Sequence, residues 1–259
     1  MQTVYLFRSG AAVVLGAVVA LALSGPSSIS AEDKKDEGWI PLFNGKDLTG
    51  WKMFNPPSGE FKELKEVKNA AGKVVAFVGV TNERKDKKGN VTPSKEFTLW
   101  QVKDGTIVGG GPASHLFTEI EADNFHYRVE AKINDKGNSG QYFRTAFGPG
   151  FPKGYEAQIN ATHGDQIRTG SLYPSFGKLS EDERKQILVL KDAPNKPDEF
   201  FVQEVVADGP HIQIFVNGKK TVDFTDPNKA YTKGHFALQG HDPGSVMTFK
   251  RVEYKPIKK

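Results

Sequence analysis

The stretch Phe125-His126-Tyr127-Arg128-Val129-Glu130-Ala131-Lys132-Ile133 alternates apolar and polar residues without a break. A period of two is typical of a β-strand that buries one face and exposes the other. Residues 212–216 repeat the alternation, and Asn217-Gly218 then gives the signal of a two-residue hairpin turn. Further strands are expected at 236–238 and 246–252, with turn residues about every 10 positions. This spacing predicts an all-β fold, a sandwich or jelly roll of antiparallel strands.

Composition agrees with many short strands and excludes several classes of function. The 259 residues include 27 glycines and 15 prolines, and one short helix is expected at 180–186, where Ser180 and Glu183 have capping-box spacing. No cysteine is present, so neither a disulfide framework nor thiolate chemistry is available. The formal net charge is +4, without a basic stripe interleaved with aromatic residues, so we expect no nucleic-acid partner.

The first residues have the layout of a secretory signal peptide. Arg8 precedes an apolar run at 11–23, and small residues follow as far as Ala31. We therefore expect a signal peptide at 1–31, export to the periplasm or the exterior, and a charged linker at 32–37. The apolar run is short for a bilayer span, so no stable membrane insertion is expected after signal removal, although a retained membrane anchor is the alternative.

The remaining chain, 38–259, is expected to form one domain with an insertion at about 52–98. The insertion contains one strand pattern at 74–80 and an exposed hairpin tip at 83–90. Its apolar content is too small for an independent core, so it is expected to extend the sandwich.

Polar residues occupy one face of the predicted strand at 154–160. Glu156, Gln158 and Asn160 alternate with residues that are expected to face the core. A carboxylate beside two amides, with nothing apolar, indicates the floor of a polar groove. The alternative is an ordinary solvated face, which more often carries lysine, glutamate and threonine.

The segment 138–144 has the same character. Strict alternation places Asn138, Gly140, Tyr142 and Arg144 on one face. Glycine inside a strand marks either the close approach of a ligand or a bulge. Arg144 is expected either to clamp a carboxylate or sugar hydroxyl, or to pair with Glu156.

A third polar face lies on the strand that begins near Gly234. His235, Ala237, Gln239 and His241 are expected to share it, opposite two core residues. These histidines, with His115 and His163 elsewhere, suggest a metal only weakly, because no His-x-His is joined to a carboxylate at zinc-binding spacing. We therefore expect neither metal nor cofactor.

Other catalytic motifs are missing from the sequence. The glycines at 109–111 lack the lysine and helix of a phosphate-binding loop. No Gly-x-Ser-x-Gly elbow is present, and 119–123 only loosely resembles the Glu-x-Asp-x-Glu pattern of laminarinase-like glucanases. A glycosidase with two catalytic carboxylates is not indicated.

Taken together, the chain resembles the 3-keto-disaccharide hydrolase family, once catalogued as a bacterial domain of unknown function. The matching segments occur in the family's order: 38–51, 100–107, 138–144, 154–159, 168–173, 217–218 and 234–242. The insertion at 52–98 is larger than in compact members, a departure that bears on substrate preference.

The resemblance implies a concanavalin A-like, laminarinase-type jelly roll of two antiparallel sheets with a concave groove. It also implies an exported hydrolase of 3-keto-glycosides or 3-keto-disaccharides. A C3 ketone acidifies the C2 proton, so a base removes it, the oxygen on C1 leaves, and water adds back. On this basis we expect an oligosaccharide or keto-sugar substrate.

Roles follow as hypotheses from that chemistry. Glu156 is the expected base and His241 the expected acid. Arg144, Gln158 or Tyr173 is expected to polarise the ketone, while Asn138, Tyr142 and Gln239 bind the substrate. Trp39 and Trp51 are expected either to stack on sugar rings or to pack the sandwich edge. The competing interpretations are a non-catalytic carbohydrate-binding module of the same fold and an extracellular adhesion or scaffold domain.

Overall fold

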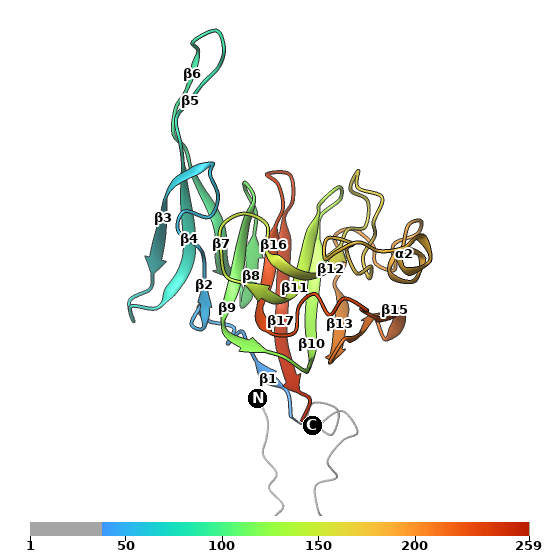
Figure 1. The fold of residues 1–259 in the computed structure, drawn as a ribbon. Coiled ribbons are helices and arrows are strands. Elements are labelled where there is room, and N and C mark those ends of the chain that lie inside the picture. Colours follow the sequence, from blue (N-terminus) through green and yellow to red (C-terminus); the bar gives the residue numbers. More distant parts are fainter. Residues whose placement is uncertain (1–37, 259) are drawn as a thin grey trace, which may run out of the picture. The chain divides into compact units, whose positions relative to one another are not determined.

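The computed structural model describes residues 38–258, which form two large antiparallel sheets facing each other (Figure 1). The predicted signal peptide at 1–31 and linker at 32–37 lie outside the described residues. Among the helices of residues 38–258, none is long and apolar enough to cross a membrane.

The larger sheet has ten strands, and the smaller has five. The larger runs in the order β15, β14, β13, β10, β17, β8, β7, β4, β3, with β1 paired to β17. Its strands are β1 Ile40–Pro41, β3 Phe61–Lys68, β4 Val74–Thr81, β7 Glu96–Lys103, β8 Thr106–Gly109, β10 Phe125–Ile133, β13 Phe201–Asp208, β14 His211–Val216, β15 Lys219–Thr225 and β17 Met247–Pro256. The smaller runs in the order β12 Lys153–Ile159, β11 Ser139–Ala146, β16 Gly234–Gly240, β9 Ser114–Ala122 and β2 Trp51–Lys52.

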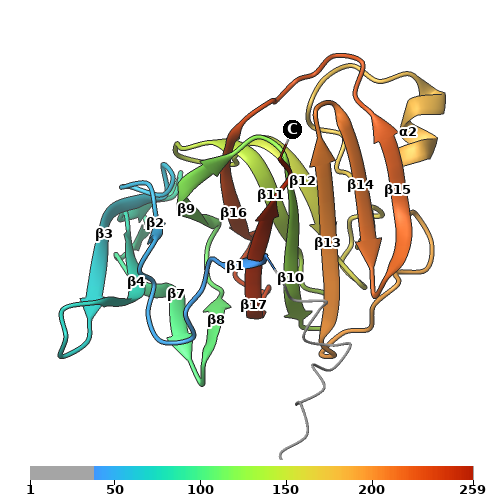
Figure 2. The ribbon, with the colours of Figure 1, turned by 90° about the horizontal axis from the view of Figure 1, so that it is seen from below.

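The hydrophobic core fills the space between the sheets. Phe125 and Tyr127 of β10 are fully buried there, as the alternation of that strand predicts. Across the interface, Phe236 of β16 meets Phe125 edge to face with ring centroids 4.8 Å apart. Full burial of such a side chain stabilises the fold by roughly 1.5–3 kcal/mol. The predicted jelly-roll sandwich is therefore confirmed, and Figure 2 shows the two layers from below.

Local signals also match the structure. Asn217 and Gly218 have φ values of 49° and 77°, and they join β14 to β15 as the predicted tight turn. The predicted helix is α2, Glu181–Ile187, and Ser180 and Glu183 form its capping box.

Strands from the predicted insertion lengthen the larger sheet. β4 pairs with β7, and β3 forms the sheet edge beyond β4. β5 (Arg84–Lys85) and β6 (Val91–Thr92) form a separate hairpin that projects from this end (Figure 1). The insertion thus extends the larger sheet, and its buried residues Phe61 and Phe77 belong to the common core.

Candidate functional site

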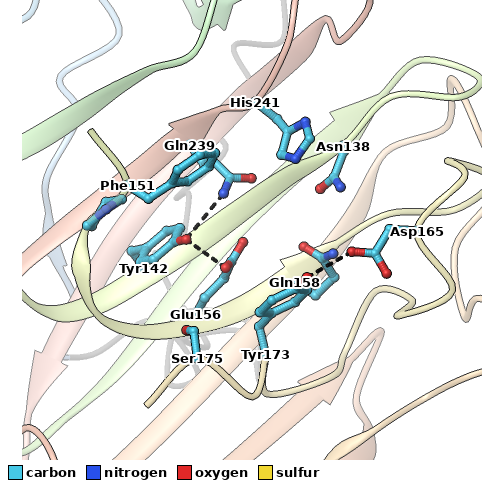
Figure 3. A pocket seen from close by; sticks show the side chains of 11 residues that line it. Asn138, Tyr142, Phe151, Glu156, Gln158, Asp165, Tyr173, Ser175, Gln239 and His241 are labelled. Atoms are coloured by element: carbon cyan, nitrogen blue, oxygen red, sulfur yellow. Dashed lines mark hydrogen bonds between the residues drawn. The ribbon is translucent and has the colours of Figure 1, made fainter. Parts of the chain in front are cut away.

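A cavity of about 260 Å³ lies on the outer face of the smaller sheet, opposite the core (Figure 3). Strands β11, β12 and β16 supply its floor, and the connecting loops supply its walls. Its lining residues are Asn138, Tyr142, Phe151, Pro152, Glu156, Gln158, Asp165, Tyr173, Ser175, Gln239 and His241. Every site residue expected from the sequence lines this cavity except Arg144.

Arg144 lies outside the cavity, so the expectation that it faces Glu156 is wrong. Alternation along β11 would place Arg144 beside Tyr142, but the strand pairing shifts register just after Phe143. Arg144 also has a φ of 51°, in the left-handed region. Such a bulge changes the direction of the side chain, and a sequence pattern does not reveal it.

The guanidinium of Arg144 instead joins three backbone segments. It donates hydrogen bonds to the carbonyl oxygens of Asp123, Gly209 and Tyr231 at 2.8, 2.7 and 3.3 Å. Arg144 therefore does not pair with Glu156, and its guanidinium is held by backbone carbonyl oxygens.

Glu156 is the titratable group at the centre of the floor. Its side chain approaches the backbone of Gly140 so closely that a Cβ there would lie 2.2 Å from Oε1. The glycine is therefore needed to make room for a side chain of the neighbouring strand, whereas the sequence had suggested either a ligand or a bulge at this position. Burial raises the pKa of Glu156 to about 8, although the hydrogen bond from Tyr142 acts in the opposite direction.

Tyr142 and Gln239 hold the Glu156 carboxyl in place. The Tyr142 hydroxyl donates to Glu156 Oε2 at 2.6 Å, and Gln239 Nε2 donates to that hydroxyl at 3.2 Å (Figure 3). His115 packs against the Tyr142 ring, and burial lowers the pKa of His115 to about 3. His115 is therefore neutral near pH 7 and adds no charge beside the floor.

His241 enters from the end of β16 and is oriented by its neighbour Asp242. His241 Nδ1 lies 2.8 Å from Asp242 Oδ2, which also accepts from Ser245 Oγ at 2.7 Å. Burial alone would raise the pKa of Asp242, but these hydrogen bonds outweigh it and hold the pKa below its ordinary value. An ionised Asp242 leaves Nε2 of His241 available for proton transfer.

The opposite wall comes from loops, of which the sequence pointed to Tyr173 and missed the other lining residues. Tyr173 donates to Asp165 Oδ2 at 3.1 Å, and burial, followed by the charge of Asp165, raises the pKa of Tyr173. Asp165 and Ser175 belong to no periodic segment, so no strand pattern pointed to them. Phe151 was also missed; its only signal is an aromatic residue between Gly150 and Pro152, two loop-forming residues.

Three amide oxygens on the cavity wall are buried and have no protein partner among residues 38–258. They are Asn138 Oδ1, Gln158 Oε1 and Gln239 Oε1. A buried acceptor without a partner costs about 1–3 kcal/mol, so a ligand that donates hydrogen bonds would relieve this cost. Sugar hydroxyls are such donors.

The tryptophans named from the sequence do not line this cavity. Trp51 is 4% exposed within the core, and its Nε1 donates to the carbonyl of Leu42, so the packing alternative is correct for it. Trp39 stacks on Arg128 of the other sheet. The aromatic side chains that line the cavity are Tyr142, Phe151 and Tyr173, and of these Phe151 is 58% exposed.

A metal site is not favoured by the hydrogen bonding. His163, His241 and Asp242 each offer a ligand atom within 4.8 Å of the others. However, His163 Nδ1 accepts from the backbone N–H of Asp165 at 3.1 Å, so a neutral His163 carries its proton on Nε2, facing Asp242. A ligating nitrogen must instead offer its lone pair.

Comparison with known proteins adds two findings. Residues 38–258 match the family described as 3-keto-alpha-glucoside-1,2-lyase-like domain. A provisionally assigned glycosyl hydrolase from Parabacteroides distasonis ATCC 8503 is 24% identical, with a TM-score of 0.55, over 89% of this chain and 99% of that one. A second from the same strain is 20% identical, with a TM-score of 0.56, over 85% and 99%. Among curated proteins, none matches.

Proposed function

The chain belongs to the family of 3-keto-alpha-glucoside-1,2-lyase-like domains, and from this premise we propose that it cleaves glycosides whose sugar carries a ketone at C3. The observation that supports the proposal most is the buried carboxyl of Glu156 in a cavity walled by amides, hydroxyls and His241. The C3 ketone acidifies the C2 proton. Cleavage then needs a base, a donor for the enolate oxygen and an acid for the leaving oxygen.

Glu156 is the base in this proposal. A carboxylate with a pKa near 8 binds a proton more strongly than an ordinary one, which favours abstraction from carbon. Tyr142 fixes its position by the 2.6 Å hydrogen bond, so the carboxylate needs little reorganisation.

Gln158 is the donor proposed for the ketone oxygen, since it lines the cavity beside Glu156. The oxyanion that forms at C3 accepts its hydrogen bond. Tyr173, the alternative donor, would first have to release Asp165, which accepts its hydroxyl proton. Asn138 and Gln239 receive sugar hydroxyls through their unpartnered oxygens.

His241 is the proposed acid. Asp242 holds its Nδ1, and its Nε2 proton passes to the glycosidic oxygen. In this elimination the C2–H and C1–O bonds break and a C1=C2 double bond forms. Glu156 gains the C2 proton, and the released alcohol gains the proton of His241. Addition of water across C1=C2 completes a net hydrolysis.

Replacement of Glu156 by glutamine tests the assignment. We expect Glu156→Gln to release free sugar from 3-keto-trehalose about 10²–10⁴-fold more slowly, because the base is lost while the shape is kept. Glu130→Gln is the matched control, because Glu130 lies on the other sheet. A fully active Glu156→Gln protein would end the assignment.

The same incubation separates the enzyme from a carbohydrate-binding module. Calorimetry that detects binding of 3-keto-trehalose without any release of sugar would favour the module. Neither binding nor release would favour the adhesion or scaffold alternative.

Export belongs to the proposal through the signal-peptide pattern at 1–31. Protein recovered from the periplasm or medium is expected to begin near residue 32 when its N-terminus is sequenced. Recovery of chains that still begin at Met1 from the membrane fraction would support the retained anchor instead.

A further inference from the structure

A second hollow of about 460 Å³ adjoins the site, and the insertion builds most of its wall. The ends of β4 and β7 and the hairpin of β5 and β6 supply one side. The other side is formed by residues 112–113 and 241–243, so His241 borders both hollows. The two spaces therefore meet at the residue proposed to protonate the leaving oxygen.

The lining of this hollow combines an apolar surface with polar groups. Phe97, Pro112 and Pro243 give the apolar part. Thr92 and Lys95 add a hydroxyl and an ammonium group, and Lys95 has no ion-pair partner among residues 38–258. A ring with apolar C–H faces and hydroxyl edges, such as a second sugar, matches this combination.

We infer that the hollow built by the insertion binds the leaving group, and that this group is a hydroxyl-bearing ring of about the size of a sugar. The inference rests on the proposed function, because it places the oxidised sugar in the first cavity. The bond that breaks then lies beside His241, with the oxidised ring on one side and the leaving ring on the other.

This arrangement makes the insertion a determinant of specificity. A small leaving group, such as methanol, leaves the second hollow empty and gains nothing from Phe97 or Lys95. A second sugar fills it, and its contacts position the glycosidic oxygen for the proton of His241.

A substitution that fills the hollow tests the inference. Thr92 lines the hollow, whereas its neighbour Val91 does not, because adjacent strand residues point to opposite faces. We expect Thr92→Trp to lower kcat/KM for 3-keto-trehalose at least tenfold and to leave methyl 3-keto-α-glucoside unaffected. Val91→Trp is expected to change neither. Both residues are exposed, so both variants are expected to fold, and Thr92→Phe is the substitute if Thr92→Trp does not.

Each other outcome has a distinct meaning. Equal activity of Thr92→Trp and wild type on both substrates would show that the hollow is not used. Equal losses on both substrates would show that the effect does not depend on the leaving group, and would also overturn the inference. If the wild-type protein released nothing from either substrate, the proposed reaction itself would be wrong.

Discussion

The Glu156 carboxyl carries a pKa near 8 in a site where ionisation is opposed by burial. As the base, it must be ionised while His241, the proposed acid, is protonated, so kcat/KM is expected to follow a bell-shaped pH profile with one limb near pH 8. Tyr142→Phe removes the hydrogen bond that lowers the pKa of Glu156, and should move that limb to higher pH. A pH–rate profile of both proteins measures the shift; a limb that stays in place in Tyr142→Phe would contradict the role of Glu156 as the base.

The same shift predicts a cost in stability. The folded protein holds the proton of Glu156 to a higher pH than the unfolded chain, whose carboxyl has the ordinary value of 4.5. The stabilisation is complete below 4.5 and is lost as the pH rises through about 8. The free energy of unfolding of Glu156→Gln at pH 9 is therefore expected to exceed that of wild type by on the order of a few kcal/mol. Urea unfolding at pH 4 and pH 9 measures the difference, which should vanish at pH 4.

At the scale of strands, alanine substitutions at Gly140 of β11 and at Gly109 of β8 are expected to have opposite effects on activity and stability. A Cβ at Gly140 would meet the Glu156 carboxyl at 2.2 Å, whereas one at Gly109 would meet Met247 and Trp100 in the core at 2.5 Å. Gly140→Ala is therefore expected to lose activity with a smaller loss of stability. Gly109→Ala is expected to lose about 1–3 kcal/mol by overpacking but to keep kcat. Thermal melts and initial rates of both variants test the contrast.

Sequence reasoning was reliable where a strand is regular. The alternation of β12 placed Glu156 and Gln158 on the face opposite Tyr155 and Ala157, because a period of two needs no knowledge of distant residues. It was wrong for Arg144, since a bulge interrupts the alternation of β11.

The loops at the cavity were beyond the reach of sequence periodicity. Asp165 and Phe151 reach the cavity from connections whose paths depend on packing against other segments. Similarly, the insertion was recognisable from its composition. Its position as a wall of the second hollow, near His241, depends on the tertiary pairing of β4 with β7.

Across the whole molecule, Arg144 ties the smaller sheet to turns beside the larger one. Its three carbonyl partners lie in the β9–β10 turn, the β13–β14 turn and the segment before β16. Arg144→Ala is expected to reduce stability by a few kcal/mol, because hydrogen bonds of a charged donor contribute about 1.5–3 kcal/mol each and are not additive. Chemical denaturation measures that loss. The kcat of the folded fraction should stay near that of wild type. A loss of kcat without a matching loss of stability would mean that Arg144 takes part in catalysis.

The two sheets serve different purposes in this account. The larger sheet and the core hold the smaller sheet rigid, and the smaller sheet presents Glu156, Gln158 and Gln239 on its outer face. Rigid strands position catalytic groups more accurately than loops do. Substrate choice is left to the loops and to the insertion.

Removal of the C2 proton is the step on which the whole proposal depends, and deuterium at that carbon measures it. With 3-keto-trehalose deuterated at C2 of the oxidised ring, we expect slower release of free sugar than from the unlabelled compound, and loss of the deuterium to solvent. Equal rates, with the deuterium retained at C2 of the product, would mean that the C1–O bond breaks without elimination and that Glu156 is not a base for carbon.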